Sequence, residues 1–300
     1  MRTYRVYQVD SFTTEKFKGN PAGVVPNADG LSEREMLAIA RELNNSETAF
    51  IFSPDGPDHD IQIRYFTPTV EVPVCGHATI AAHYVRAIEK QLESTTVMHK
   101  IKIGTLPVEV IKQSNSYLII MTQGTIEFRE PITGWQRNEI ITALGLSEKD
   151  IDERCPVQIV STGHGKVMIG IKYRSKLGSL TPDMSLLKQL SADIGCNGYF
   201  VFTMDSHIPG VFTHGRMFAP AIGIAEDPVT GNANGPLGAY LIRHRLAKYD
   251  GNLFGFTGEQ GTAIGRSGIV DVQVKIENDE PVQVKIGGQA VVVFQTEITL

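Results

Sequence analysis

Two short glycine turns carry the residue types best suited to chemistry in this chain. Cys75-Gly76-His77-Ala78 has a counterpart, Thr230-Gly231-Asn232-Ala233, about half a chain later. Each is expected to open a helix, where the first backbone N–H groups lack partners and the helix dipole is positive. Such helix ends bind anions. We therefore predict that the amides after Gly76 and Gly231, together with Asn232, hold a substrate carboxylate or a developing negative charge.

Three side chains near these turns are candidates for moving a proton. Glu47 follows a polar run and precedes the apolar strand residues 49–52, so partial desolvation suits it to act as a general base. His77 at a helix N-terminus suits a neutral proton relay. Asp227, just before Pro228, is a second acid. Each also has an ordinary structural interpretation when taken alone: a surface glutamate, a helix-capping histidine and a turn aspartate.

Other catalytic and ligand-binding patterns are absent from the sequence. His77 and His83 are six residues apart and do not share a helix face, and no HExxH or paired CxxC motif is present, which argues against a metal. Neither GxGxxG entering a helix, a Walker loop nor GxSxG occurs. Cys75 is the only thiol beside the expected site, and Thr230 replaces it in the second turn, so no two-thiol pair is available. We expect no metal and no cofactor.

The turns belong to a longer repeat that must position them. Arg64-x-Phe66-x-Pro68 precedes the first turn, and Arg216-x-Phe218-x-Pro220 precedes the second. Both copies are expected to form a strand, a tight glycine turn and the start of a helix. This pattern predicts two similar domains whose helix N-termini face one cleft, with the active site in it.

The helix after each turn is apolar on nearly all sides and rich in small residues, which predicts burial all round. We expect an α+β fold in which each domain is a rolled sheet, or barrel, around one such helix. Pro236 is expected in the first turn of the second helix. The strand pattern lapses over residues 124–134, which places the domain boundary there: residues 1–126, possibly completed by about 288–300, and residues 127–287.

Composition limits the function classes. The hydrophobic fraction of 42% and charged fraction of 20% are ordinary for a globular protein. A net charge of −5 with a pI near 5.9 argues against nucleic-acid or anionic-membrane partners. No apolar stretch is long enough to span a bilayer, and the N-terminus lacks a signal pattern. Three cysteines, an odd number, suggest reduced thiols and a cytoplasmic location.

The combined motifs resemble the PhzF-like phenazine-biosynthesis family. They are Phe17-x-Gly19-Asn20-Pro21-Ala22, Asn45-Ser46-Glu47-Thr48, Arg64-x-Phe66-Thr67-Pro68, Glu71 to Thr79, Glu226 to Gly231, and Gln260-Gly261. The resemblance covers essentially the whole chain. It implies the diaminopimelate epimerase-like fold, a homodimer, and a cofactor-independent isomerase with Glu47 as catalytic residue, supported by His77 and Asp227. Asn20, Ser46 and Thr230 lie in these motifs and are expected to bind substrate.

This sequence departs from the family pattern at one site position, because the family's serine in the second turn falls on Asn232. Asparagine donates and accepts hydrogen bonds but is larger and has no hydroxyl, which indicates a different substrate. Two alternatives to the isomerase stay open. One is a one-base epimerase or racemase acting through Cys75, and the other is a non-catalytic small-molecule binding protein. Solvent deuterium would enter the substrate of an enzyme of this kind but not the ligand of a binding protein.

Overall fold

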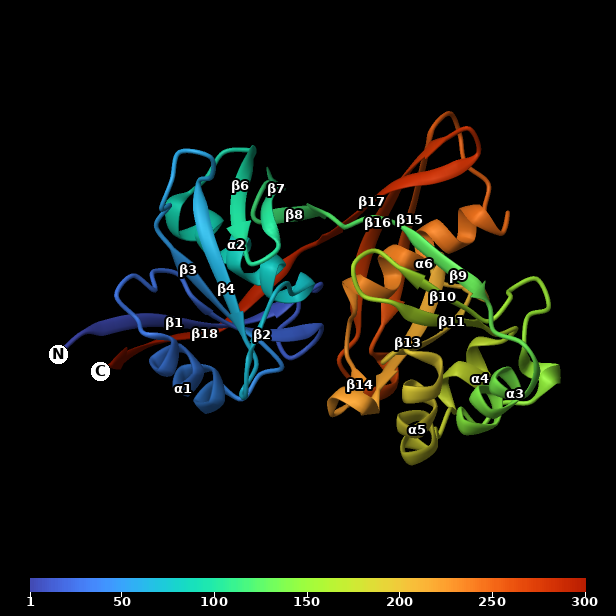
Figure 1. Ribbon diagram of the computed structural model, residues 1–300. Helices are drawn as coiled ribbons and strands as arrows, with labels where there is room; N and C mark the ends of the chain where they lie inside the picture. Colours follow the sequence, from blue (N-terminus) through green and yellow to red (C-terminus); the bar gives the residue numbers. More distant parts are fainter. The chain divides into compact units, whose positions relative to one another are not determined.

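The computed structural model describes residues 1–300 and divides into two compact units. The first unit comprises Met1–Thr122 and Gly287–Leu300, and the second comprises Gln123–Ile286. Figure 1 shows that β18, near the C-terminus, lies beside β1 at the N-terminus, so the last strand completes the first unit. The predicted boundaries at 126/127 and 287/288 lie close to these divisions.

The first unit is one sheet with two helices. Its elements are β1 (Thr3–Ser11), β2 (Asn20–Val25), α1 (Glu33–Leu43), β3 (Thr48–Phe52), β4 (Ile61–Phe66), β5 (Glu71–Val72), α2 (Gly76–Lys90), β6 (Thr95–Ile101), β7 (Gly104–Lys112), β8 (Tyr117–Thr122) and β18 (Ala290–Thr299). The strands pair in the order β18-β1-β2-β3-β4-β6-β7-β8. Helix α2 contacts strands from both ends of this order, including β18 and β8. The sheet therefore curls around α2.

The second unit repeats this arrangement. Its elements are β9 (Glu127–Pro131), α3 (Gly134–Ala143), η1 (Glu148–Asp150), β10 (Gln158–Ser161), β11 (Lys166–Gly170), α4 (Arg174–Gly178), α5 (Met184–Ile194), β12 (Tyr199–Thr203), β13 (Thr213–Ala219), η2 (Pro220–Ile222), β14 (Ile224–Asp227), α6 (Gly231–Arg243), β15 (Leu253–Gln260), η3 (Thr262–Ile264), β16 (Gly268–Glu277) and β17 (Glu280–Gly288). Its strands pair in the order β9-β10-β11-β12-β13-β15-β16.

The pairing directions of the strands agree between the two units, strand by strand. From β1 to β7 the successive pairings are antiparallel, parallel, antiparallel, parallel and antiparallel. From β10 to β16 the same sequence of directions recurs. The predicted α+β fold with a duplicated unit is confirmed in this topology.

The repeated Arg-x-Phe motif makes the same contacts in both units. Arg64 donates from Nε to Glu71 at 2.8 Å, and its guanidinium lies 5.1 Å from the ring centre of Phe66. Arg216 donates from Nε to Glu226 at 2.9 Å and lies 5.0 Å from the ring centre of Phe218. Each arginine therefore ties its own strand, β4 or β13, to the short strand, β5 or β14, that comes just before the glycine turn.

Both central helices are buried on nearly all sides, as their composition predicts. In α2, ten of the 15 residues are buried, and in α6 eleven of the 13 are. The prediction for Pro236 is wrong, because it is the sixth residue of α6 and lies in the second turn. Proline has no N–H to bond the carbonyl four residues earlier, so the carbonyl of Asn232 loses its usual helical partner next to the glycine turn.

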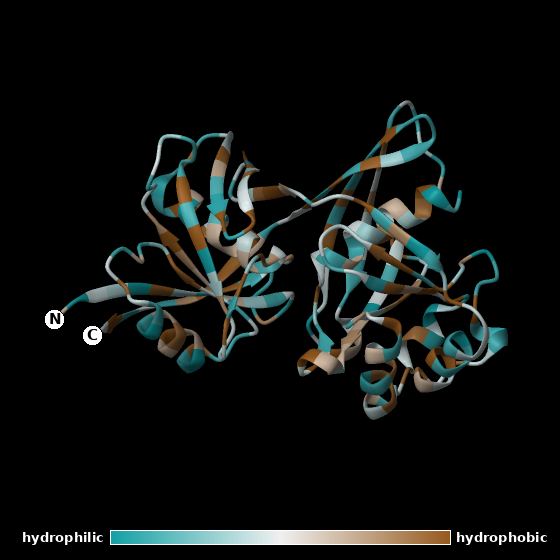
Figure 2. Ribbon diagram, viewed as in Figure 1, coloured by the Kyte–Doolittle hydropathy of each residue, from teal (hydrophilic) through white to brown (hydrophobic).

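Helix α1 covers the first sheet with one face only. Its buried residues are Met36, Ile39 and Ala40, and Figure 2 shows hydrophilic and hydrophobic positions side by side along it. A capping box closes its start: Glu35 N–H donates to the hydroxyl of Ser32 at 3.3 Å, and Ser32 N–H donates to the Glu35 carboxylate at 2.8 Å.

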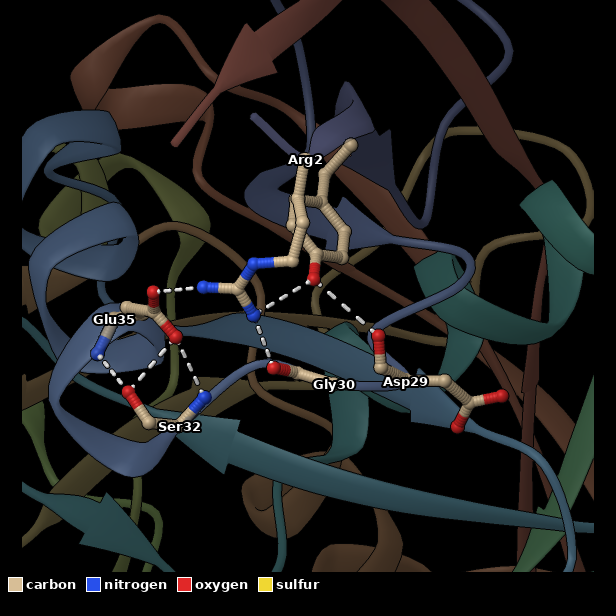
Figure 3. A network of polar contacts seen from close by, with 6 residues as sticks. Arg2, Asp29, Gly30, Ser32 and Glu35 are labelled. Atoms are coloured by element: carbon tan, nitrogen blue, oxygen red, sulfur yellow. Dashed lines mark hydrogen bonds and ion pairs between the residues drawn. The ribbon is translucent and has the colours of Figure 1, made fainter.

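A polar network fastens the start of the chain to this helix (Figure 3). The guanidinium of Arg2 donates to the Glu35 carboxylate, to the carbonyl of Gly30 and, at 3.3 Å, to the hydroxyl of Tyr4.

Arg2 also lines a cavity of about 600 Å³ with Arg5, Asp29, Glu89 and Glu297, among others. Arg2 and Arg5 are paired with the carboxylates of Glu35 and Glu89, and no predicted site residue lines this cavity.

One local prediction needs correction. A strand, β9, occupies part of the segment where the strand pattern was expected to lapse, and it pairs with β10 through an irregular register. Its burial pattern is mostly exposed, which removes the alternation that predicts a strand. No helix is both long enough and apolar enough to cross a membrane.

Candidate active site

The first unit brings Glu47, His77 and Cys75 together at the start of α2. Glu47 lies just before β3, and its backbone carbonyl accepts from the N–H of Gly23 at 3.3 Å, which holds this strand end against β2. Oε2 of Glu47 lies 3.4 Å from Nε2 of His77, and the two side chains are only 18% and 9% exposed. Cys75 is buried, with Sγ 3.5 Å from Nδ1 of His77. Three groups that can exchange protons therefore lie next to one another, with His77 between Glu47 and Cys75.

Both nitrogens of the His77 ring have side-chain partners. Nε2 forms a hydrogen bond with the hydroxyl of Ser46 at 3.3 Å, and the Glu47 carboxylate lies beside the same nitrogen. Nδ1 contacts the thiol of Cys75. The imidazole therefore lies between the carboxylate on one side and the thiol on the other.

The start of α2 presents backbone donors without a side-chain cap. Cys75 is the N-cap residue, Gly76 and His77 are the first two helical residues, and Cys75 makes no side-chain cap hydrogen bond. The hydroxyl of Ser11 donates to the carbonyl of His77 at 2.8 Å, and Ser11 pairs with Asn20, the buried first residue of β2. Asn20 is thereby placed beside the first glycine turn. An uncapped helix start of this kind favours an anion.

The second unit brings Asp227, Thr230, Gly231 and Asn232 to the start of α6. Thr230 is the N-cap residue and makes no side-chain cap hydrogen bond. Instead, its hydroxyl donates to the carboxylate of Asp227 at the end of β14. Gly231 and Asn232 follow as the first helical residues, matching Gly76 and His77. The equivalence extends one turn further, since Thr79 and Asn234 each donate to the carbonyl of their own N-cap residue.

Two glutamines hold this second turn in place. Gln260 donates from Nε2 to the carbonyl of Asp227 at 2.8 Å and accepts at Oε1 from the backbone N–H of Thr230 at 3.0 Å. Gln123 donates to the carbonyl of Gly231 at 3.1 Å and to Oδ1 of Asn232 at 3.0 Å. Because Gln123 fixes Oδ1 as an acceptor, the amide nitrogen of Asn232 is the remaining donor for a ligand.

Sequence reasoning did not identify Gln123 as a site residue, although Gly235 leaves the space that its side chain occupies. A Cβ added at Gly235 would lie 1.9 Å from Oε1 of Gln123, so the glycine makes room for the glutamine against α6. In the sequence, the small residues after the second turn predict only a buried helix, and Gln260 stands out only as part of the Gln260-Gly261 motif.

Lys166, at the start of β11, was also missed. Its stem passes close to the backbone of β12, since a Cβ at Gly198 would lie 2.4 Å from Cδ of Lys166 and 2.5 Å from Cε of Met217. Met217 pairs with Asp227 across β13 and β14. Burial lowers the pKa of Lys166, and the negative charge of Asp227 acts in the opposite direction. The ammonium therefore lies within electrostatic range of the proposed second acid.

The first cluster also has the ligand types of a metal site. One ligand atom each from Glu47, Cys75 and His77 lies within 4.8 Å of the other two. A thiolate, an imidazole and a carboxylate are all zinc ligands. The sequence prediction of no metal rested on spacing, and spacing cannot detect ligands from a strand end and a helix start that meet only in the fold.

Comparison with known proteins identifies the family of this chain. The family model described as "Phenazine biosynthesis-like protein" matches residues 9–296. An uncharacterized isomerase of Clostridium acetobutylicum is 59% identical over 300 residues, covering 100% of this chain and 99% of that protein. The trans-2,3-dihydro-3-hydroxyanthranilate isomerase of Pseudomonas aeruginosa is 30% identical over 269 residues, covering 88% of this chain and 87% of its own length.

Solved structures agree with this placement. A PhzF-family phenazine biosynthesis protein of Bacillus anthracis superposes with a TM-score of 0.90 at 32% identity, covering 100% of both chains. A hydroxyproline epimerase of Agrobacterium vitis shares the fold, with a TM-score of 0.63 at 14% identity, covering 100% of this chain and 93% of its own. The predicted diaminopimelate epimerase-like fold and isomerase class are confirmed. The chain belongs to the phenazine-biosynthesis-like family, PhzC-PhzF.

Proposed function

We propose that this protein moves a proton between carbons of a small, carboxylate-bearing substrate by general acid–base catalysis, without a cofactor. The observation that carries the proposal is the 3.4 Å contact between the Glu47 carboxylate and the His77 imidazole. The carboxylate is largely shielded from water and has an imidazole beside it. Such a group is suited to take a proton from carbon and to return it.

In the proposed reaction, Glu47 removes a proton from a carbon next to an unsaturated or carboxylate group. The electron pair of the broken C–H bond delocalises onto oxygen, where the backbone N–H groups at the start of α2 stabilise the negative charge. The proton, now on Glu47, returns to a different carbon of the same substrate. His77, which lies beside the carboxylate, assists the placement of the proton.

We propose that the second cluster contributes to the same reaction. Asp227 supplies a further acid, and Thr230, Gly231 and Asn232 bind polar groups of the substrate, with Asn20 and Ser46 as binding residues of the first unit. The support is the repeat, since both clusters stand at the uncapped start of equivalent helices. We further propose that the protein is a cytoplasmic homodimer, because two-fold dimers are the commonest oligomers; light scattering of the purified protein tests the dimer.

A second candidate is a one-base epimerase that acts through Cys75. The observation that favours it is the 3.5 Å contact between Sγ and Nδ1 of His77. In this candidate reaction, Nδ1 accepts the thiol proton and so generates a thiolate. The product distinguishes the two reactions. An isomerase moves a double bond or relocates hydrogen to a new carbon, whereas an epimerase returns hydrogen to the same carbon with inverted configuration.

Solvent labelling tests the proposal. Small cyclic and amino carboxylic acids, including trans-2,3-dihydro-3-hydroxyanthranilate, are first screened for binding by thermal shift. Those that bind are incubated with the protein in D₂O and analysed by NMR. We expect deuterium at a carbon that bore no exchangeable hydrogen in the substrate. Binding without any label would leave a binding protein of the same fold, and label confined to an inverted centre would favour the epimerase.

A further inference from the structure

A serine, a histidine and a glutamate form a hydrogen-bonded line in the second unit, away from the residues assigned above. Nδ1 of His214 lies 2.7 Å from Oε2 of Glu259, and Nε2 of the same ring lies 2.9 Å from Oγ of Ser206. His214 and Glu259 are register partners on the parallel strands β13 and β15. Ser206 lies in the loop between β12 and β13. Three elements therefore meet at one imidazole.

The polarity of these hydrogen bonds is the one that activates a serine. The Glu259 carboxylate only accepts, so the hydrogen on Nδ1 faces it and Nε2 carries a lone pair. The hydroxyl of Ser206 then donates to Nε2. A serine that donates to a histidine base, with the histidine oriented by a carboxylate on its other nitrogen, is the arrangement of acyl-transfer triads.

The supporting contacts keep the line rigid. Glu259 accepts from Arg174 at 3.1 Å and from the hydroxyl of Ser267 at 3.1 Å. The pKa of Glu259 is lowered, chiefly by the hydrogen bond from His214, so the carboxylate is ionised at neutral pH. His214 is 3% exposed, whereas Ser206 is partly exposed. The base and its orienting acid are thus shielded, whereas the serine residue is partly exposed.

This line is separate from the cluster at the start of α6. Successive side chains of a strand point to opposite faces of the sheet. Gln260, the residue after Glu259, points towards α6 and bonds Asn234 and Thr230. Glu259 therefore points away from α6, on the outer face of the sheet, with His214 beside it.

We propose that Ser206, His214 and Glu259 form a second catalytic site, in which Ser206 is a nucleophile towards small carboxylic esters. Oγ of Ser206 attacks the ester carbonyl while its proton passes to Nε2 of His214. The tetrahedral intermediate expels the alcohol, which takes that proton, and leaves an acyl-serine. Water, deprotonated by the same imidazole, then releases the carboxylic acid and restores the serine.

In the loop, the N–H of Ile208 donates to Oγ of Ser206 at 3.4 Å, so it bonds the nucleophile itself and not the position of an oxyanion. An efficient oxyanion hole commonly uses more than one donor. We therefore expect slow ester turnover, and covalent labelling is the more sensitive readout. A fluorophosphonate probe reacts at phosphorus with an activated serine, releases fluoride and stays attached.

The experiment is labelling of the full-length protein with a fluorophosphonate probe, followed by peptide mass mapping. We expect the adduct on Ser206, its complete loss in Ser206→Ala, and a fall in labelling rate of about 10²-fold in His214→Gln because the general base is gone. Ser179→Ala, an exposed serine elsewhere in the unit, should label normally.

Three results would overturn the proposal: no adduct on folded wild-type protein, an adduct on another residue, or unchanged labelling in His214→Gln. Thermal melting of each variant separates loss of the base from loss of the fold, and His214→Asn provides a second variant if His214→Gln melts early. Hydrolysis of p-nitrophenyl acetate, measured in parallel, should follow the labelling of Ser206 across the variants.

Discussion

Nε2 of His77 lies 3.4 Å from Oε2 of Glu47, and Nδ1 of the same ring lies 3.5 Å from Sγ of Cys75. One imidazole therefore joins the two candidate bases of the first unit. A carboxylate can take a proton from carbon directly, whereas a thiol must first give up its own proton.

Zinc should inhibit the protein by occupying this cluster. The three ligand atoms lie within 4.8 Å of one another, and small movements bring them to the roughly 2.0–2.3 Å that zinc requires. Once an active substrate is known, we expect micromolar Zn²⁺ to stop turnover and a chelator to restore it. Cys75→Ser should be at least about tenfold less sensitive. Cys196→Ser, which changes a buried thiol of the second unit, should remain as sensitive as the wild type.

Removal of Gln260 should damage the second turn more than the fold as a whole. Its amide bonds the backbone of Asp227 and Thr230 and the side chain of Asn234. Gln260→Leu should cost about 1–3 kcal/mol in the free energy of unfolding, because polar groups are left buried without partners. It should also reduce kcat by more than tenfold, since Asp227 loses its support. Gln295→Leu, on an exposed position of β18, is the matched control and should change neither. An unaltered kcat in Gln260→Leu would show that the second cluster is not needed for the reaction.

Lys166 should set the acidic limb of the pH–rate profile. A nearby ammonium favours the ionised form of Asp227, so its removal in Lys166→Met raises the pKa of that carboxyl. The acidic limb of kcat/KM should then move to higher pH, by up to about one unit. Lys188→Met, an exposed lysine on α5, should leave the profile in place. A profile that is merely scaled down, without displacement, would contradict this role for Lys166.

Two buried histidines should make the first unit sensitive to mild acid. Nε2 of His83 lies 3.3 Å from Nδ1 of His99, and both residues are almost fully buried. Burial lowers the pKa of His99 from 6.5 to about 4, and burial together with the neighbouring His99 lowers that of His83. Below pH 6.5 the unfolded chain binds protons that the folded chain does not. Stability is therefore complete above that pH and falls as the pH drops towards 4, by up to about 1.4 kcal/mol per pH unit for each histidine.

Urea denaturation at pH 7.0 and 5.0 measures this effect through the shift of the midpoint. His99→Gln should reduce the shift, because one of the two depressed groups is removed. His207→Gln is the control, since the His207 side chain is 88% exposed and should leave the shift unchanged. Equal shifts in the wild type and His99→Gln would rule out this histidine as the origin of the acid sensitivity.

The sequence was sufficient to predict the features that repeat along the chain or follow a hydrophobic period. The duplicated Arg-x-Phe strands, the glycine turns and the apolar central helices all have local patterns, and together they predicted the paired units. Residues that become neighbours only in the fold could not be predicted from the sequence. Gln123 reaches the second turn from the chain segment after β8, and Lys166 approaches Asp227 across three strands. Neither belongs to a motif.

The same limit applies to the two clusters that no spacing rule could identify. The contact between Glu47 and Cys75 depends on how β3 meets the start of α2, and the line from Ser206 to Glu259 depends on the register of β13 and β15. The error at Pro236 has a different cause. The proline itself is evident in the sequence, but the residue at which its helix begins could be predicted only to within a turn. Where β9 is mostly exposed, burial no longer imposes the alternation by which a strand is recognised.

The central claim is that Glu47, and not Cys75, removes the proton from carbon. It is tested most directly by comparing the rate of deuterium entry from D₂O into a bound substrate for Glu47→Gln and Cys75→Ser, with both variants shown to melt like the wild type. Glu47→Gln should lower that rate by about 10²–10⁴-fold, whereas Cys75→Ser should stay within about tenfold of the wild type. Rapid deuterium entry in Glu47→Gln, with loss in Cys75→Ser, would contradict the claim.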